Sequence, residues 1–147
     1  MFILTNNADE TYEVGEKLGK IALPGHIITL SGDLGVGKTV FAKGFARGLG
    51  INEPITSPTF TILQEYITGR IPLYHFDVYR VSDPEEMYEV GFDDYLYGNG
   101  VCLIEWAELI KDILPANIIS IKITKDDPKL YDHRRIEISG LKGDIDI

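Results

Sequence analysis

The sequence predicts an α/β fold in which a mixed, partly antiparallel β-sheet is flanked by helices in three layers. Short apolar runs alternate along the chain with segments whose apolar residues recur at helical spacing. The apolar run at residues 27–30 leads through a glycine-rich loop into such a segment, as in a βα unit. A turn at Gly69-Arg70 joins two strand-like stretches, and such a hairpin breaks a purely parallel pattern.

The first half of the chain predicts two helices that each follow a strand. Asn6-Asn7 supplies capping side chains for a helix over residues 8–22, whose apolar residues fall on one face. A second helix over residues 38–49 ends at Gly50, a residue suited to a C-cap. Strands are expected at residues 2–5, 27–30, 59–66 and 73–76.

The second half predicts shorter helices and further strands. Residues 82–86 combine a capping side chain, an early proline and carboxylates, which favours a helix that runs to about residue 90. Residues 92–98 are expected to form a short helix or a turn, and residues 106–114 are weakly helical. Strands are expected at residues 101–104, 118–124 and 135–138, and the first of these is apolar throughout, as in a central strand buried on both faces.

Composition favours one ordinary globular domain over residues 1–147. The apolar share of 44% and the charged share of 25% are typical of such domains. No apolar run approaches the roughly 20 residues that span a bilayer, and residues 1–7 lack the basic flank of a signal peptide. We therefore expect a cytoplasmic protein. Cys102, the single cysteine, lies in an apolar run, so we expect a buried thiol.

The charge balance argues against an extensive nucleic-acid surface. The formal net charge is −9, from 23 acidic and 14 basic residues, and such a surface repels a phosphate backbone. The cluster His133-Arg134-Arg135 is too small to reverse this. An acidic surface is more compatible with a basic protein partner.

Residues 32–39 read G-x-x-x-x-G-K-T, the pattern of a phosphate-binding loop. Such a loop connects the end of a strand to the N-terminus of a helix, and both elements are predicted here. Lys38 is then expected to reach the β- and γ-phosphates and Thr39 to bind Mg²⁺. The fold expected is accordingly like that of the P-loop NTPases. The candidate phosphate-binding residues are Gly35, Val36, Gly37, Lys38, Thr39 and Val40.

Two acidic residues follow predicted strands and are candidates for the remaining chemistry. A Mg²⁺ at Thr39 needs a carboxylate at the end of a neighbouring strand. Glu105 follows the more continuously apolar run, so it is the first choice for the metal, directly or through water. Asp77 is a candidate to orient the attacking water or to support the metal shell. The alternative for each acid is that it ends a strand in solvent.

Ser57-Pro58-Thr59 follows the phosphate-loop helix, where its hydroxyls are candidates for a switch that senses the γ-phosphate. The alternative is a plain turn. Arg80 is a candidate cation near the developing phosphate charge, or else an ordinary partner of Asp83 or Glu85.

Two further residues have a structural interpretation beside a functional one. His75 alternates with aromatic residues in a predicted strand, so we expect a packed, hydrogen-bonded side chain. Trp106 directly follows Glu105 and either shields the site from water or packs in the core or against a partner.

Four sequence blocks together resemble the TsaE family, formerly called YjeE. They are the loop at residues 32–39, Ser57-Pro58-Thr59-Phe60, residues 74–80 (Tyr-His-Phe-Asp-Val-Tyr-Arg) and Leu103-Ile104-Glu105-Trp106. The resemblance covers nearly the whole chain and implies a small bacterial ATPase of the tRNA threonylcarbamoyladenosine pathway. It also implies weak ATP hydrolysis alone, and stimulation where the TsaD and TsaB proteins meet. Modification of adenosine 37 in ANN-decoding tRNAs would then involve tRNA only indirectly, which is compatible with the acidic charge.

The resemblance carries over residue by residue. Lys38 matches the phosphate-binding lysine, Thr39 and Glu105 match the Mg²⁺ positions, and Asp77 matches an acid needed for hydrolysis. Ser57 to Thr59 match the switch. The resemblance also suggests adenine contacts from Thr11 and from Arg134 or Arg135. Val36 and Val40 replace the alanine and threonine that many relatives have, and neither change removes a ligand atom that the chemistry requires.

Two other functions stay open at this stage. A small-molecule kinase uses the same loop but needs several arginines over its acceptor, and only Arg70 and Arg80 lie in the middle of the chain. A GTPase or a non-hydrolysing nucleotide-bound adaptor is the other alternative. The chain has no Asn-Lys-x-Asp tetrad, which disfavours guanine recognition.

Overall fold

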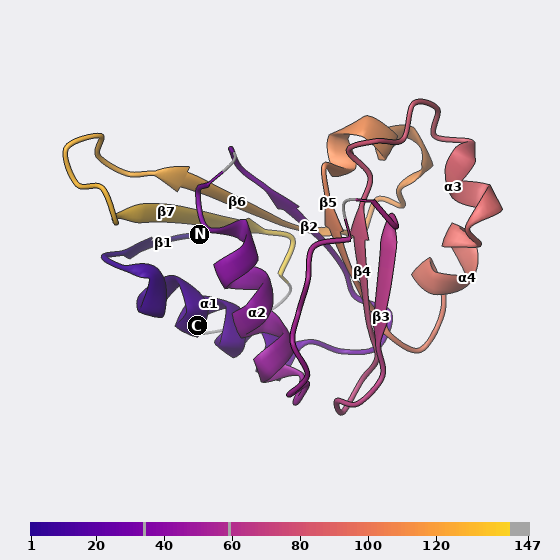
Figure 1. Cartoon of the computed structure of the whole chain (residues 1–147), viewed down its shortest axis with the longest axis horizontal. Coiled ribbons are helices and arrows are strands. Elements are labelled where there is room, and N and C mark those ends of the chain that lie inside the picture. Colours follow the sequence, from indigo (N-terminus) through magenta and orange to yellow (C-terminus); the bar gives the residue numbers. More distant parts are fainter. Residues whose placement is uncertain (34, 59, 142–147) are drawn as a thin grey trace.

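The computed structural model describes residues 1–33, 35–58 and 60–141. Over these residues a seven-stranded sheet has the order β1-β7-β6-β2-β5-β4-β3 (Figure 1). The strands are β1 (Phe2–Thr5), β2 (Ile27–Ser31), β3 (Leu63–Tyr66), β4 (Leu73–Asp77), β5 (Val101–Glu105), β6 (Ile119–Lys125) and β7 (Arg134–Ser139). The helices are α1 (Ala8–Ile21), α2 (Lys38–Gly48), α3 (Glu86–Glu89), α4 (Phe92–Leu96) and the 3₁₀ helix η1 (Ala107–Ile113).

The sheet is mixed, as the sequence predicts. Strand β2 lies between β5 and β6 and is parallel to both, and β4 is parallel to β5. The β3–β4 hairpin adds an antiparallel strand at one edge, and β7 is antiparallel to both β1 and β6. Because β5 lies directly beside β2, the carboxyl ends of β2, β4 and β5 meet at one edge of the sheet, where ligands bind in such folds.

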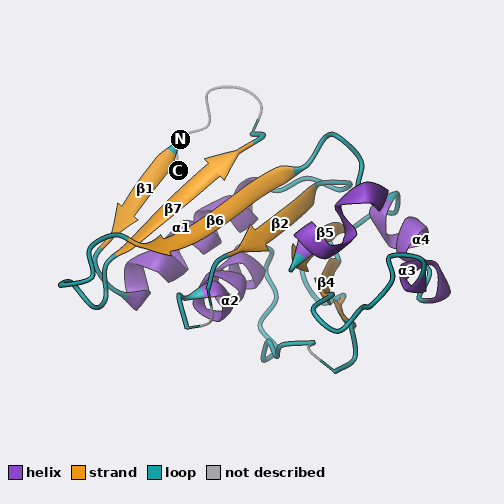
Figure 2. Cartoon of the chain, turned by 90° about the horizontal axis from the view of Figure 1, so that it is seen from above, coloured by secondary structure: helices purple, strands orange, loops and turns teal. Residues whose placement is uncertain are grey.

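Helices α1 and α2 lie on one face of the sheet, and η1, α3 and α4 lie beside β4 and β5 on the other (Figure 2). Each of these two layers has its own apolar core. Alternate residues of β5 point to opposite faces, so Leu103 joins the core under α1 and α2, which also contains Phe41 and Phe45. Ile104 joins the core that contains Phe92 of α4. The predicted three-layer α/β fold is confirmed.

Glycines let α1 and α2 pack at backbone distance. A Cβ on Gly15 would lie 2.4 Å from the carbonyl oxygen of Phe41, and a Cβ on Gly44 would lie 2.1 Å from that of Tyr12. Gly19 and Gly48, one helical turn further along, are equally close to the opposite backbone. No side chain fits at these positions unless the helices separate, so α1 holds the position of α2 through peptide groups.

Three local predictions were inaccurate. The strand predicted from residue 59 begins only at Leu63, because the N–H groups of Thr61 and Ile62 turn back onto the Pro58 carbonyl and Ile62 has a φ of 67°. The helix predicted over 82–90 is a single turn at α3, preceded by a turn in which Asp83 accepts from the Glu85 N–H at 3.0 Å. The segment after β5 is 3₁₀ rather than α-helical.

Two further observations concern the burial of the cysteine and the presence of membrane-spanning helices. Cys102 is buried, as expected, and desolvation raises the pKa of its thiol to about 12. None of the helices in the described part of the chain is long and apolar enough to cross a membrane.

Candidate nucleotide-binding site

The glycine-rich loop joins β2 to α2, as the sequence predicts. Gly35 and Gly37 have φ values of 75° and 112°, in the left-handed region that favours glycine. Gly37 is the N-cap of α2 and offers no side chain to its amides, so the first N–H groups of the helix remain as donors for an anion. Leu34, within the same loop, lies outside the described residues.

A cavity of about 500 Å³ opens between this loop and the ends of β4 and β5. Lys38 enters it from the start of α2, Asp77 from the end of β4 and Glu105 from the end of β5. Asp77 and Glu105 are register partners on adjacent parallel strands. The lining residues are Gly35, Gly37, Lys38, Thr39, Val40, Ser57, Asp77, Tyr79, Arg80, Glu105 and Trp106.

Both acids are buried at the carboxyl ends of β4 and β5, so neither ends its strand in solvent. Asp77 is 5% exposed and Glu105 is 8% exposed. One oxygen of Asp77, Oδ1, accepts a hydrogen bond from the Tyr79 N–H at 3.0 Å. Buried carboxylates that line a cavity are candidates for a functional use of their negative charge.

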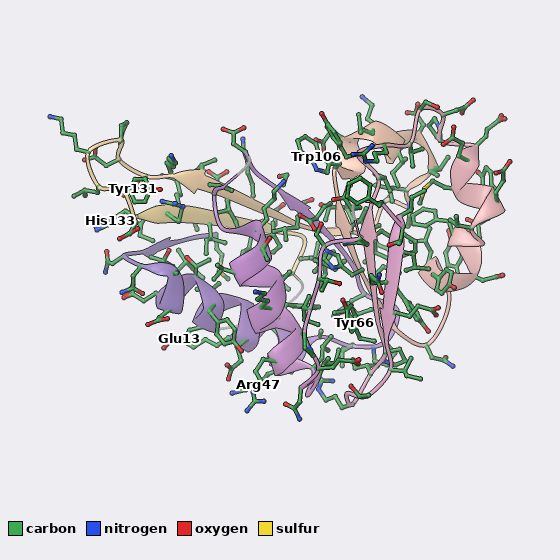
Figure 3. All side chains as sticks on the ribbon, viewed as in Figure 1. Glu13, Arg47, Tyr66, Trp106, Tyr131 and His133 are labelled. Carbon is green, nitrogen blue, oxygen red and sulfur yellow. The ribbon has the colours of Figure 1, made fainter. Side chains whose placement is uncertain are left out.

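Lys38 lies against the aromatic wall of the cavity. Its Nζ is 4.5 Å from the centre of the Trp106 ring, a cation–π distance. The Tyr79 and Trp106 rings are in turn 4.8 Å apart. Figure 3 shows Trp106 at the end of the sheet where β5 stops. Trp106 therefore lines the cavity and packs against Tyr79 there.

His75 is packed and hydrogen-bonded, as expected, and its partner is Glu105. The distance between His75 Nε2 and Glu105 Oε2 is 2.8 Å, and both side chains are nearly inaccessible to solvent. Sequence reasoning missed this pair. The signal was present, because His75 and Asp77 are two residues apart in one strand and so point to the same face as Glu105 of the neighbouring strand.

The candidate switch is only partly described. Ser57 lines the large cavity, whereas Thr59 lies outside the described residues. Arg80 also lines the cavity, with its guanidinium 4.4 Å from the centre of the Phe60 ring. Among the described residues Arg80 forms no ion pair with Asp83 or Glu85, so the ordinary ion-pair interpretation is not supported.

A second, smaller cavity of about 140 Å³ lies on the other side of the loop. Thr11 and Arg134 both line it, together with Ala8, Gly35, Val36, Gly37, Val40 and Asp132. The Thr11 hydroxyl shares a 2.8 Å hydrogen bond with that of Thr5. Val40, a predicted phosphate-loop residue, lines both cavities.

Of the two arginines suggested to contact the adenine, only one lines the smaller cavity. The Nε–H of Arg134 donates to the Val36 carbonyl at 2.7 Å, so this residue also holds the phosphate loop in place. Arg135 instead pairs with Glu137 and lies 4.0 Å from the centre of the Phe2 ring. Successive strand residues point to opposite faces, so only Arg134 reaches the cavity.

No group of three or more His, Cys, Asp or Glu side chains within residues 1–33, 35–58 and 60–141 is arranged to hold a metal ion. A metal at this site would therefore need oxygens beyond the protein carboxylates. Thr39 and Glu105 both line the large cavity, and hydroxyl and carboxylate oxygens are the ligands that Mg²⁺ takes beside nucleotide phosphates. The residues present thus fit a metal that arrives with a nucleotide.

A model of a known protein family matches most of this chain. The family model described as Threonylcarbamoyl adenosine biosynthesis protein TsaE matches residues 5–136. The chain belongs to the TsaE family. The match confirms both the resemblance of the four sequence blocks and the expected role in threonylcarbamoyladenosine biosynthesis.

Individual TsaE relatives are similar over most of the chain. A Bacillus subtilis (strain 168) protein, named tRNA threonylcarbamoyladenosine biosynthesis protein TsaE, is 50% identical over 121 residues, which are 82% of this chain and 75% of the relative. A Treponema pallidum (strain Nichols) protein of the same name is 43% identical over 123 residues, 84% and 90% of the two chains. The crystal structure of Bacillus subtilis YdiB is 43% identical with a TM-score of 0.79, covering 92% of this chain and 82% of that one.

Proposed function

We propose that this TsaE-family chain is a Mg²⁺-dependent ATPase that supports threonylcarbamoyladenosine modification of tRNA. The observation that carries the proposal is the convergence of Lys38, Thr39, Asp77 and Glu105 on one cavity beside the open N-terminus of α2. Loop amides and a lysine bind the phosphate chain, and the buried carboxylates bind the metal ion and orient a water molecule. This set of groups is what phosphoryl transfer to water requires.

Each predicted residue has a role in this proposal. Lys38 and the loop amides neutralise the β- and γ-phosphates. Thr39 and Glu105 would hold Mg²⁺, which offsets charge on the phosphate oxygens. Asp77 orients the attacking water, and Ser57 with Thr59 senses whether the γ-phosphate is present.

The smaller cavity is the proposed place for the nucleoside end of ATP. Thr11 from α1 and Arg134 from β7 line it, and Gly35 and Gly37 are shared with the larger cavity. A ligand that passes over the glycine loop therefore reaches both cavities. The shared loop supports a nucleotide rather than inorganic phosphate alone.

The proposed partners are the TsaD and TsaB proteins, with tRNA contacted only through them. The net charge of −9 supports this arrangement, because an acidic protein binds a phosphate backbone poorly on its own. Hydrolysis is expected to be slow in the isolated protein and to rise when the partners are present.

The structure disfavours the kinase alternative. A kinase needs arginines over the acceptor, but Arg70 donates to the carbonyls of Gly19 and Lys20 at 2.6 and 2.8 Å, at the end of α1. Of the two arginines in the middle of the chain, only Arg80 lines the large cavity. One arginine is insufficient for a lid of the expected kind.

The proposal is tested by measuring ATP turnover of the purified protein alone, with TsaD and TsaB, and with those proteins and tRNA. Strong stimulation by the partners is expected, and equal rates in all three mixtures would contradict the partner proposal. Transfer of phosphate to a metabolite faster than to water would favour a kinase. A Glu105→Ala variant that supports modification without hydrolysis would favour an adaptor.

Lys38→Ala tests the site itself. We expect loss of most ATP binding, because the variant lacks the cation that faces the phosphates. Lys43→Ala is the matched control, since Lys43 is an exposed lysine of the same helix outside the large cavity. Equal ATP affinity in the two variants would contradict the loop assignment.

A further inference from the structure

Glu105 has one direct partner that the proposed ATPase chemistry does not use. His75 Nε2 lies 2.8 Å from Glu105 Oε2. The exposed fractions of the two side chains are 3% and 10%, so this contact is shielded from water. Shielding strengthens a hydrogen bond to a carboxylate and makes its loss costly.

The direction of the bond follows from its chemistry. A carboxylate oxygen only accepts, so the hydrogen must sit on His75 Nε2. The other ring nitrogen, Nδ1, is buried and has no hydrogen-bond partner among the described residues. Glu105 is therefore the one polar contact of this ring in the described part of the chain, and the ring orientation serves that contact.

His75 itself does not reach the ligand space. The residues that line the large cavity include Asp77 and Glu105 but not His75, which lies two residues deeper in β4. The strand pairing fixes this arrangement, because Asp77 is opposite Glu105 and His75 is opposite Leu103. His75 thus supports the carboxylate from behind.

We propose that His75 is a positioning residue, which holds Glu105 Oε2 through its Nε2–H so that the carboxylate keeps a fixed orientation toward the metal position of the cavity. Within the described residues, Glu105 Oε1 has no hydrogen-bond or ion-pair partner, which leaves it for a ligand. This inference rests on the proposed function, in which Glu105 holds Mg²⁺. Groups that orient a metal ligand from behind commonly change metal affinity or activity by about 10- to 100-fold when removed.

The competing explanation is that the bond only makes burial of Glu105 tolerable. Both explanations predict that loss of His75 destabilises the fold. Only the positioning role predicts a selective effect on metal binding that returns when the hydrogen-bond donor is restored.

The test uses Mn²⁺ as a probe for the metal position, in the full chain bound to a non-hydrolysable ATP analogue. Mn²⁺ affinity is measured by electron paramagnetic resonance, and analogue affinity is measured separately in EDTA. His75→Leu removes the donor, and His75→Gln replaces Nε2–H by an amide N–H in a similar place. Phe76→Leu is the stability control, since Phe76 packs in the core on the opposite sheet face.

We expect His75→Leu to weaken Mn²⁺ binding about tenfold while analogue affinity in EDTA stays unchanged. His75→Gln should restore most of the Mn²⁺ affinity, and Phe76→Leu should leave it unaltered despite a lower unfolding midpoint.

Two results would overturn the proposal in distinguishable ways. Wild-type Mn²⁺ affinity in folded His75→Leu, or an equal loss in Phe76→Leu, would overturn the positioning role alone. Failure of the wild-type protein to bind the analogue or Mn²⁺ would overturn the proposed ATPase function and the positioning role together.

Discussion

The two cavities beside the glycine loop are built from different parts of the chain and offer different chemistry. The larger one takes its acids from the ends of the parallel strands β4 and β5, and Lys38 supplies a cation. The smaller one is formed by the start of α1 and the β6–β7 hairpin, with Thr11 and Arg134 in its wall. Figure 3 shows Tyr131 and His133, near the tip of that hairpin, well to the left of Trp106.

The difference indicates a division of work between the cavities. Charged groups that face each other across a space suit a reaction in which charge moves, which is the proposed role of the larger cavity. The smaller cavity combines a hydroxyl, loop peptide groups, Arg134 and Asp132, and a small space of this kind suits recognition of a ligand. Substitutions of the acids in the larger cavity should therefore change kcat, and those in the smaller cavity should change affinity.

The largest effect is expected from Asp77→Asn in the larger cavity. The amide keeps the size of the side chain and an oxygen for the Tyr79 N–H, but it loses the negative charge that we propose orients water. We expect kcat for ATP hydrolysis to fall by at least about 100-fold, with ATP affinity within about twofold of wild type. Steady-state kinetics and equilibrium ATP binding measure the two quantities. A loss of affinity with normal turnover would show that Asp77 belongs to binding instead.

Gly37→Ala should affect both cavities, because Gly37 lines each of them. Its φ of 112° is strained for alanine by about 1–3 kcal/mol, whereas a Cβ would meet nothing closer than Thr11 at 3.8 Å. We expect ATP affinity to fall about tenfold as the loop relaxes, measured by calorimetry. Gly25→Ala is the matched control, with a φ of 88°, open space around its Cβ and no place in either cavity. Equal loss of ATP affinity in both variants would mean that general destabilisation is the cause.

Arg134→Met should reduce affinity without slowing the reaction at saturating ATP. The variant lacks the 2.7 Å bond to Val36, and a net hydrogen-bond contribution of about 1 kcal/mol corresponds to about fivefold weaker ATP binding. Arg135→Met is the control, since Arg135 contacts Glu137 and Phe2 instead. A lower kcat with normal affinity in Arg134→Met would break the division between the cavities.

The smallest effect is expected from His26, at the start of β2 and away from both cavities. Burial lowers the pKa of His26, and its Nδ1 accepts from the Leu23 N–H at 3.1 Å. Since the unfolded chain binds the proton more readily, this contribution to stability is complete above the ordinary pKa of 6.5 and is lost as the pH falls through the folded pKa.

Urea unfolding at about pH 7.5 and pH 5 measures this effect. His26→Asn keeps an acceptor for the Leu23 N–H but does not titrate, so its stability should fall less between the two pH values than that of wild type. Equal losses would show that other groups account for the pH dependence. ATP affinity of the variant should match wild type at both pH values.

Much of the larger cavity was predictable from sequence, because its residues terminate strands. A strand that ends in an acid places that acid at a sheet edge wherever the strand pairs, and an apolar run such as that before Glu105 pairs centrally. The loop pattern predicted Gly35, Gly37, Lys38, Thr39 and Val40. The wrong predictions concern the bounds of single elements. Strand β3, for example, begins only at Leu63, because the preceding N–H groups donate to the Pro58 carbonyl instead of pairing with β4.

The smaller cavity and the supporting contacts were less predictable. Arg134 and Val36 are separated by 98 residues, and their contact depends on how the last hairpin pairs with the rest of the sheet. The bond between His75 and Glu105 likewise requires the register of β4 on β5. The sequence does contain a signal for the packing of α1 on α2. Each helix has a pair of glycines four residues apart, a pattern typical of close helix contact.

The glycine contacts between α1 and α2 limit where this molecule can deform. A side-chain layer adjusts by changing rotamers, whereas peptide groups in direct contact have no such freedom. Thr11 on α1 and the loop that begins α2 must then travel together as one rigid block. Under the proposed function, we therefore expect a rearrangement that follows loss of a γ-phosphate to occur at the opposite wall, where the segments after β4 and β5 line the large cavity and a partner protein would detect it.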